Sequence, residues 1–182
     1  MKRLLISAAG LILTSVAALA ADPFTLTSSD FKDGTIMDRK HAGNIATNPN
    51  CVGQNVSPEL KWTNAPAAAK SFVIVISDWE GQGGLGSHHL LAYNIAPTIT
   101  GFAEGELSKA SNKFTGGKES SGTTAYRGPC PPGGTAHHYT FTVVAPDLES
   151  GALSAGLTRD ELWEKLKGHA KGAAGLVGLF KR

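Results

Sequence analysis

Three segments of this sequence place side chains capable of acid, base or hydrogen-bond chemistry beside glycine or proline. In chain order these side chains are Asp78, Glu80, His88, His89, His137 and Tyr139. Carboxylates, imidazoles and a phenol that meet in one cavity can hold an anion and can transfer protons. If the three segments converge, we therefore expect an anion-binding pocket.

A stiff turn precedes the last of these segments. The run "GPCPPGG", residues 128–134, leads directly into His137 and the alternating pattern "HHYTFTVVAP". Proline fixes φ and lowers the cost of ordering a site, and Gly128, Gly133 and Gly134 let backbone N–H groups approach a ligand closely. The turn is therefore interpreted as one wall of the pocket.

Strands must position these side chains. The β-branched run "SFVIVISD", residues 71–78, predicts a central strand buried on both faces, with Asp78 at its end in line with Phe72, Ile74 and Ile76. The glycine-rich residues 81–86 then permit a sharp return. The pocket is expected where this strand ends.

Each histidine pair must be divided between the two faces of its strand, because side chains alternate along a strand. In "SHHLLAYNI", residues 87–95, alternation puts His89 with Leu91 and Tyr93, and sends His88 to the other face. In the later strand His137 and Tyr139 share a face. We expect His89 and His137 in the pocket, and His88 and His138 as surface or hydrogen-bonded sheet residues.

The other elements follow from shorter patterns. Residues 24–27 predict an edge strand, Leu60 and Trp62 a buried strand face, and residues 98–124 a long surface loop. The sequence "TRDE", residues 158–161, is a capping box that opens a helix. Leu162 and Leu166 are expected to face inward, and His169 is a further candidate for that face. The tail "AAGLVGLF" is compatible with a short strand or a short helix.

Composition and the N-terminus indicate where the protein acts. Residues 1–20 have the basic start, apolar centre and Ala18-Leu19-Ala20 exit of a signal peptide cleaved after Ala20. No later segment has the length and apolarity of a transmembrane anchor. Without Lys2 and Arg3 the 17 basic residues become 15, equal to the 15 acidic ones, which disfavours a nucleic-acid partner. Residues 21–182 are expected to form one domain that is periplasmic or secreted.

The two cysteines fit that compartment. Cys51 and Cys130 both lie in loop-like sequence, and an oxidising compartment favours a disulfide between them. Two separate buried thiols remain the alternative, since spacing alone does not establish a bridge.

Two enzymatic uses of the polar residues have weaker support in the sequence than an anion-binding pocket has. His89 and His137 with Asp78 or Glu80 offer acceptable zinc ligands, but the sequence has no H-E-x-x-H or C-x-x-C spacing, so no metal or other cofactor is expected. A serine hydrolase would need a G-x-S-x-G elbow, which is absent. A hydrolase with His137 as base and Asp78 as orienter lacks an evident nucleophile.

Taken together, the segments resemble the phosphatidylethanolamine-binding protein (PEBP) family, and more closely its bacterial Raf-kinase-inhibitor-like branch. The similarity rests on "CVGQNVSPELKW", "SDWEGQGGLGSHHLLAYNI", "YRGPCPPGGTAHHYTFTVVA" and the ending "GHAKGAAGLVGLFKR". The third block is the most specific. The resemblance implies a mostly β protein, an antiparallel sandwich of one large and one smaller sheet with peripheral α-helices.

The resemblance also implies a small anion pocket at one end of the sandwich. Carried over residue by residue, the expected pocket residues are Asp78, Glu80, His89, Tyr126, Gly128, Pro132, His137 and Tyr139. The family's D-P-D-x-P is here Asp78-Trp79-Glu80-Gly81-Gln82, so both prolines are missing and the second acid is longer. The rim of the pocket is expected to be looser or differently shaped.

The function implied is binding of a phosphoryl head group such as phosphorylethanolamine. A protein-interaction role against a protease or a host signalling protein is the main alternative, and a hydrolase is the weakest. The sequence is compatible with a monomer or a homodimer.

Overall fold

The computed structural model describes residues 22–182, so the expected signal peptide over residues 1–20 lies outside the described residues. The strands are β1 (Thr25–Thr27), β2 (Thr35–Ile36), β3 (Leu60–Thr63), β4 (Phe72–Asp78), β5 (Ser87–Ile95), β6 (Gly101–Phe102), β7 (Thr115–Gly116), β8 (His137–Pro146) and β9 (Ala170–Phe180). The helices are α1 (Gly81–Gly84), α2 (Arg159–Leu166) and the 3-10 turns η1 (Arg39–His41) and η2 (Glu106–Ser108).

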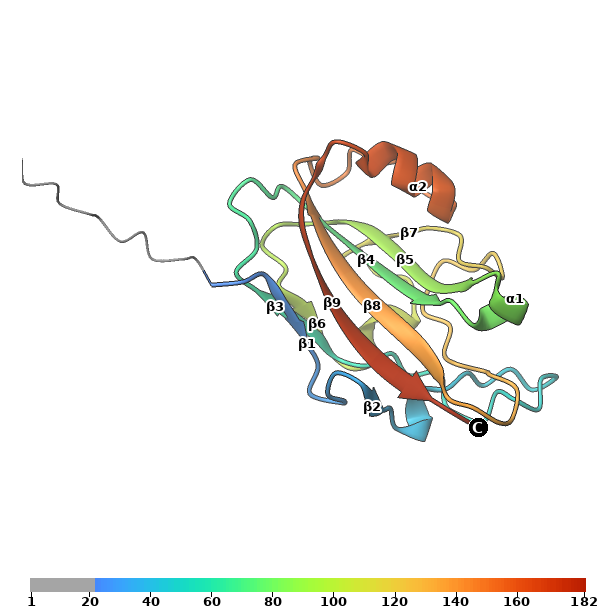
Figure 1. Ribbon diagram of the computed structural model, residues 1–182. Coiled ribbons are helices and arrows are strands. Elements are labelled where there is room, and N and C mark those ends of the chain that lie inside the picture. Colours follow the sequence, from blue (N-terminus) through green and yellow to red (C-terminus); the bar gives the residue numbers. More distant parts are fainter. Residues whose placement is uncertain (1–21) are drawn as a thin grey trace, which may run out of the picture.

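These strands form two sheets. A six-stranded sheet has the order β2-β9-β8-β4-β5-β7, and a three-stranded sheet has the order β1-β3-β6. All pairs are antiparallel except β2 with β9. Figure 1 shows the small sheet beside the long curved strands of the large one. The expected mostly β sandwich of a large and a smaller sheet is confirmed.

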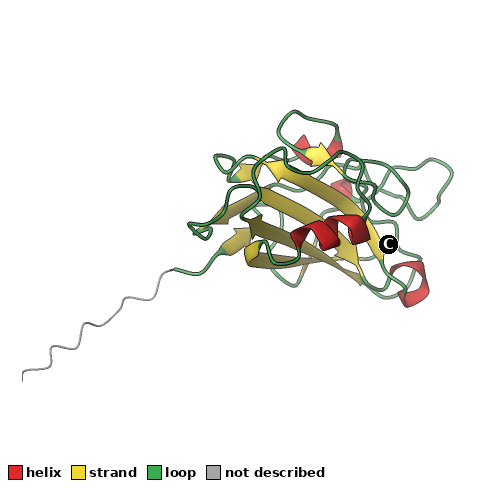
Figure 2. Cartoon of the chain, turned by 90° about the horizontal axis from the view of Figure 1, so that it is seen from above, coloured by secondary structure: helices red, strands yellow, loops and turns green. Residues whose placement is uncertain are grey.

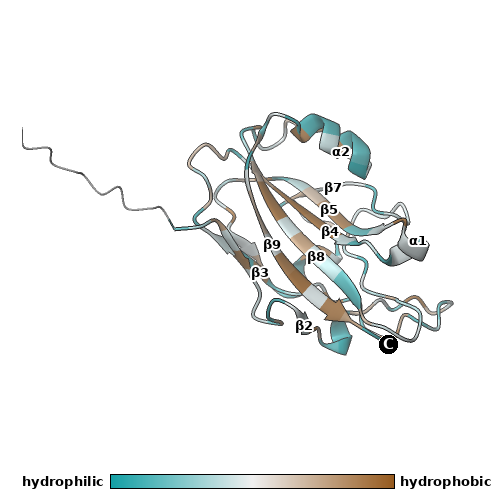
Figure 3. Cartoon of the chain, in the orientation of Figure 1, coloured by the Kyte–Doolittle hydropathy of each residue, from teal (hydrophilic) through white to brown (hydrophobic). Residues whose placement is uncertain are grey.

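Both faces of the large sheet are covered. Trp62 from the small sheet packs edge-on against Phe72, and this main core continues through Ile74 and Phe141. On the opposite face Val73 and Tyr93 pack under Leu162 of α2. Figure 2 shows α2 lying across the sheet, and Figure 3 shows the apolar character of β4, β5, β8 and β9. This double coverage explains why β4 is apolar at almost every position.

Several predicted elements are confirmed. β4 lies between β5 and β8 and is buried throughout, β1 is an edge strand, and Leu60 and Trp62 are buried while Lys61 is exposed. The capping box of α2 is complete, since the side chains of Thr158 and Glu161 each bond the other's backbone N–H.

Three expectations need correction. Segment 98–124 contains β6, η2 and β7, because Phe102, Leu107 and Phe114 are buried in the main core. The tail is a long strand that starts at Ala170. His169 does not face inward, because α2 ends at Leu166 and the exposed imidazole pairs with Asp147. Within residues 22–182 none of the helices has the length and hydropathy needed to cross a membrane.

Candidate functional site

A cavity of about 250 Å³ opens where β4 ends and where β5 and β8 begin. The loops around residues 42–55 and 127–136 lie at the same end of the sheet in Figure 1. The cavity is lined by Asn48, Asp78, Glu80, Gly81, Gln82, Gly83, Ser87, His89, Arg127, Gly128, Cys130, Pro131, Pro132, His137 and Tyr139. The structure therefore brings together seven of the eight residues expected there.

Tyr126 is the exception. Its ring is buried behind the cavity wall and its hydroxyl donates to the backbone carbonyl of His41 at 2.9 Å. Burial raises the pKa of Tyr126, so the hydroxyl remains a donor. Tyr126 anchors the wall from behind and does not line it. Pro132 lies at the exposed rim, and the buried Pro131 forms the deeper wall.

Asp78 is a buried carboxylate with several partners. Its Oδ1 accepts hydrogen bonds from the backbone N–H of Glu80 at 2.9 Å and of Gly81 at 3.0 Å. Its Oδ2 lies 2.8 Å from Nδ1 of His137. The chain leaves extended geometry directly after Asp78, and that turn supplies the two N–H donors. Asp78 thus fixes the orientation of the His137 ring.

Glu80 does not continue the parity of β4. Its backbone has turned into an αR conformation, and its carboxylate pairs with the exposed His138, with 2.6 Å between Oε1 and Nδ1. Burial alone would raise the Glu80 pKa, but hydrogen bonds from the His138 side chain and backbone outweigh it and lower the pKa to about 2. Both cavity acids therefore have an imidazole partner.

His89 reaches the cavity by a route that alternation does not predict. In the β4–β5 register Ile76 pairs with Leu90, but Ser77 pairs with His88, so His89 is an extra residue in a β-bulge. The bulge turns His89 to the face of Leu90, where its ring lies edge-on, 5.2 Å from the ring of Tyr139. The expectation that His89 shares a face with Leu91 and Tyr93 is wrong, because those two pack under α2.

The His89 ring is buried and neutral. Nδ1 lies 2.7 Å from the Arg127 carbonyl, which can only accept, so this nitrogen carries the hydrogen. Nε2 is buried with no hydrogen-bond partner among residues 22–182. Burial, which the Arg127 carbonyl and the charge of Asp78 oppose, lowers the His89 pKa.

Acid is expected to destabilise the protein through His89. An unfolded histidine takes up a proton near pH ~6.5, whereas folded His89, with its lowered pKa, resists protonation. Its contribution to stability is therefore complete above pH ~6.5 and is lost as the pH falls below that value. Urea denaturation between pH ~7 and ~5 should show a steeper loss of unfolding free energy for the wild type than for His89→Gln. Parallel pH profiles for the two proteins would contradict this assignment.

Tyr139 supplies the phenol. It is almost fully buried and lies on β8 opposite Asp78 of β4. Burial, and then the charge of Asp78, raise the pKa of Tyr139, so its hydroxyl stays protonated and can donate. His137 and Tyr139 share one face of β8, as alternation requires.

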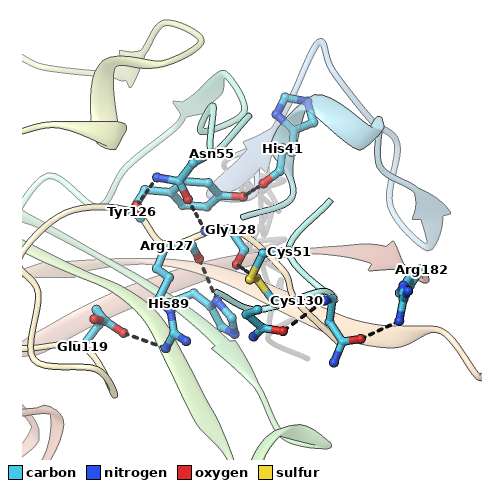
Figure 4. Close-up of a disulfide and its surroundings, with 12 residues drawn as sticks. His41, Cys51, Asn55, His89, Glu119, Tyr126, Arg127, Gly128, Cys130 and Arg182 are labelled. Atoms are coloured by element: carbon cyan, nitrogen blue, oxygen red, sulfur yellow. Dashed lines mark hydrogen bonds and ion pairs between the residues drawn. A yellow bond between two sulfur atoms is a disulfide. The ribbon is translucent and has the colours of Figure 1, made fainter. Parts of the chain in front are cut away.

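The proline-rich turn is held from four directions. The Asn55 side chain donates to the Tyr126 carbonyl at 3.1 Å and accepts from the Gly128 N–H at 2.7 Å. The backbone N–H of Gly43 donates to the Pro129 carbonyl, Cys51 and Cys130 form a disulfide, and His89 bonds the Arg127 backbone. Figure 4 shows the disulfide, the bonds of Asn55 to Tyr126 and Gly128, and the bond of His89 to Arg127. The expected disulfide is confirmed.

Arg127 and Asn55 were not predicted as site residues. Arg127 stands inside the glycine-proline block, where a cation beside a predicted anion pocket is a usable signal. Asn55 adopts φ 59°, a left-handed conformation that asparagine tolerates better than most residues, but no pattern in the sequence indicates its bridging role.

Within residues 22–182, two groups of side chains have the ligand types that a metal ion needs. In the first group, Asp78, Glu80 and His137 each offer one ligand atom within 4.8 Å of the others. His89 does not belong to this group. Asp30, His41 and Glu104 form the second group, where the ammonium of Lys40 already pairs with both carboxylates. In the first group the atoms are already engaged in the Asp78–His137 and Glu80–His138 pairs. That geometry suits hydrogen bonding and proton transfer.

Comparison with known proteins connects this geometry to a family. The family model described as "Phosphatidylethanolamine-binding protein" matches residues 27–181. A UPF0098 protein of Methanothermobacter thermautotrophicus is 34% identical over 142 residues, which cover 77% of this chain and 92% of that protein. A Mycobacterium tuberculosis (strain H37Rv) protein, LppC, whose name describes it as a candidate lipoprotein, is 35% identical over 173 residues, covering 90% of this chain and 75% of that protein.

Solved structures support the same family assignment. YbcL of Escherichia coli, described as a new member of the mammalian PEBP family, superposes with a TM-score of 0.78 at 26% identity, covering 87% of this chain and 98% of YbcL. CT736 of Chlamydia trachomatis, described as a PEBP homologue, gives a TM-score of 0.73 at 29% identity, with 87% and 97% covered. The cavity-lining segments 78–89 and 127–139 both fall inside the matched family model. The chain belongs to the phosphatidylethanolamine-binding protein family.

Proposed function

We propose that this protein binds a phosphoryl head group, such as phosphorylethanolamine, in the cavity at the end of β4. The observation that carries the proposal is the convergence of Asp78, His137 and Tyr139 with the glycine-proline turn around one small opening. Its volume of about 250 Å³ lies below the ~300 Å³ at which pockets for drug-sized ligands begin. A head group fits such a cavity better than a complete lipid does.

The charges support a zwitterionic ligand. Carboxylates beside a phosphate would repel it if they were unpaired, but Asp78 is held by His137 and Glu80 by His138. Nε2 of His137 makes no hydrogen bond within residues 22–182, and it can donate to a phosphoryl oxygen when the ring is protonated. An ammonium group on the same ligand would complement the acids.

Phosphorylethanolamine is expected to bind saturably at millimolar concentration or below, and His137→Gln to weaken binding about 10-fold through loss of a charge-assisted hydrogen bond. Isothermal titration calorimetry with ³¹P NMR measures this. His169→Gln is the matched control, because His169 also pairs with an aspartate, at 2.7 Å, but on the surface away from the cavity. Absence of saturable binding, or equal losses in the two variants, would refute the proposal.

A hydrolase is the second candidate, since the Asp78–His137 pair has the arrangement of an orienting acid and a general base. The same ³¹P spectra distinguish the two functions. A binding protein leaves the phosphomonoester signal intact over hours. An inorganic phosphate signal that grows with the wild type and not with His137→Gln would establish hydrolysis in its place.

We also infer that the protein acts in the periplasm or outside the cell after cleavage near Ala20. The signal-peptide pattern of residues 1–20 and the Cys51–Cys130 disulfide both support export. The similarity to LppC agrees with an exported protein.

A further inference from the structure

His41 is a fully buried histidine outside the head-group cavity, and one of its ring nitrogens has no partner. Nδ1 lies 2.7 Å from the Val56 carbonyl, which can only accept, so in the neutral ring Nδ1 carries the hydrogen and Nε2 has a free lone pair. Nε2 is buried and makes no hydrogen bond to any residue from 22 to 182. A buried acceptor without a partner costs free energy, which a ligand at Nε2 would recover.

Two carboxylates lie beside this ring. A ring nitrogen of His41, a carboxylate oxygen of Asp30 and one of Glu104 all lie within 4.8 Å of one another. Asp30 precedes β2, His41 ends η1 and Glu104 precedes η2, so three segments far apart in the sequence meet here. Figure 4 shows the His41 ring directed away from the disulfide, and none of the three residues lines the head-group cavity. The cluster is therefore separate from that cavity.

Two of the three side chains are fixed in place. The His41 carbonyl accepts from the Tyr126 hydroxyl at 2.9 Å, so the backbone of His41 is held in addition to its ring. The Asp30 carboxylate accepts from the backbone N–H of Glu59 at 2.7 Å. The Glu104 side chain keeps 41% of its surface exposed and can adjust. An ion that enters from solvent therefore meets two preset ligands and one adjustable ligand.

The Lys40 ammonium balances the charge of the two acids but leaves the histidine without a partner. Its Nζ lies 3.5 Å from Oδ1 of Asp30 and pairs with the Glu104 carboxylate. The Lys40 side chain is 33% exposed, and ion pairs with that much access to solvent stabilise a fold only weakly. A cation that also binds Nε2 of His41 can replace the ammonium, because the lysine side chain is free to turn into solvent.

The ligand types favour a transition-metal ion. Imidazole and carboxylate groups are zinc ligands, whereas Mg²⁺ and Ca²⁺ prefer oxygen ligands alone. A histidine that binds a metal commonly donates its other ring N–H to a backbone carbonyl, as His41 does to Val56. Ligand atoms around tetrahedral zinc lie ~3.3 Å apart, so atoms within 4.8 Å of one another need to approach by about 1.5 Å at most.

We propose that Asp30, Glu104 and Nε2 of His41 bind one zinc ion. The ion would join the segments that precede β2 and η2 to η1. The chain after η1 supports the proline-rich turn, because the backbone N–H of Gly43 donates to the Pro129 carbonyl at 2.9 Å. Zinc would therefore stabilise the wall of the head-group cavity from behind. Zinc binding here is independent of the proposed head-group function.

Isothermal titration calorimetry with zinc chloride, after removal of metals with EDTA, tests the site. Glu104→Gln is expected to weaken zinc binding at least about 10-fold, because even the loss of a residue behind a metal ligand typically costs 10- to 100-fold. Glu149→Gln is the matched control, since its exposed carboxylate also pairs with a lysine, at 2.8 Å from Lys70. It should stay within about 2-fold of the wild type. Equal zinc affinities of the two variants would overturn the inference.

Lys40→Met distinguishes a metal site from an ion-pair network. The substitution removes a cation that competes for the same carboxylates, so zinc affinity should rise about 5- to 10-fold. Lys70→Met, which removes an ammonium from an exposed pair elsewhere, should stay within about 2-fold of the wild type. A zinc affinity of Lys40→Met that is unchanged or lower would show that the acids serve only the lysine.

The group of Asp78, Glu80 and His137 is the competing zinc site among residues 22–182. His137→Gln removes a ligand from that group and none from the His41 cluster, so zinc affinity should stay within about 2-fold of the wild type. A loss of zinc binding in His137→Gln without a loss in Glu104→Gln would place the ion in the head-group cavity and overturn the inference. Titration of the metal-free protein with phosphorylethanolamine tests the proposed function separately.

A second measurement uses the wild type alone. Two-bond ¹H–¹⁵N correlation spectra resolve both ring nitrogens of each histidine. Zinc is expected to shift the Nε2 signal of His41 away from the position of a free lone pair, while Nδ1 remains protonated against the Val56 carbonyl. Saturation with zinc that shifts another histidine and leaves Nε2 of His41 unchanged would show that this nitrogen is not a ligand.

Discussion

Replacing both Cys51 and Cys130 with serine is expected to lower the free energy of unfolding by about 4 kcal/mol. The disulfide closes a loop between positions 79 residues apart, and the entropy that such a crosslink removes from the unfolded chain corresponds to a value of that size. It also joins the loop around Asn50 to the turn that carries Arg127 and Gly128. Urea denaturation of the oxidised wild type and of the double variant measures the difference.

Reduction provides the control for the serine substitutions themselves. Dithiothreitol should lower the stability of the wild type by nearly the same amount and leave the double variant unchanged. If the oxidised wild type and the double variant unfold at the same urea concentration, the crosslink does not stabilise the folded state. Phosphorylethanolamine affinity should also fall in the double variant, because the turn loses one of its four attachments.

The frame of the fold follows from local sequence rules. β4 is recognisable because a strand covered on both faces must be apolar on both, and the segment from Phe72 to Ile76 satisfies that. Alternation placed His137 and Tyr139 together because β8 pairs in regular register with β4 as far as Asp78. The capping box of Thr158 and Glu161 marked the start of α2 because its hydrogen bonds are local.

The bulge in β5 is a feature that these local sequence rules do not predict. Leu90 and Leu91 are both apolar, so the hydrophobic pattern is the same whether or not one extra residue is inserted before them. The choice between His88 and His89 for the pocket agrees with the structure, but the faces assigned to Leu91 and Tyr93 relative to His89 do not. The face on which His89 lies is decided by the register of β5 against β4, and this register depends on the tertiary structure.

The support of the site was even less accessible to sequence reasoning. Glu119, whose carboxylate pairs with Arg127, and Asn55 lie in irregular segments where no periodicity applies. Their hydrogen-bond partners are 2 to 4 residues away for Glu119 and 71 to 73 away for Asn55. The burial of the Glu119 carboxylate is possible only because Ser121 and Thr123 fold back over it. Loop side chains that bridge distant backbone groups are visible only once the fold is known.

Gly128→Ala is expected to cost at least about 3 kcal/mol of unfolding free energy and to weaken phosphorylethanolamine binding, because the site has no space for a methyl group. A Cβ at position 128 would lie 2.3 Å from the His41 carbonyl oxygen and 2.6 Å from backbone atoms of Ala42 and Gly43. These are backbone atoms, so no side-chain rotation relieves the overlap, and either the segment from His41 to Gly43 or the turn must move. Movement of the turn would shift Arg127 relative to His137. Urea denaturation and calorimetric titration measure the two losses.

Gly133→Ala is the matched control, since it makes the same substitution in the same turn, at an exposed position where a Cβ meets no atom within 4 Å. It should change the unfolding free energy by no more than about 0.5 kcal/mol and leave binding intact. The contrast separates close packing from a general effect of alanine on chain flexibility, because replacing either glycine reduces the freedom of the unfolded chain equally. Equal effects of the two substitutions would mean that the turn does not press against residues 41–43 in solution, and the anchored wall of the cavity would then have no physical basis.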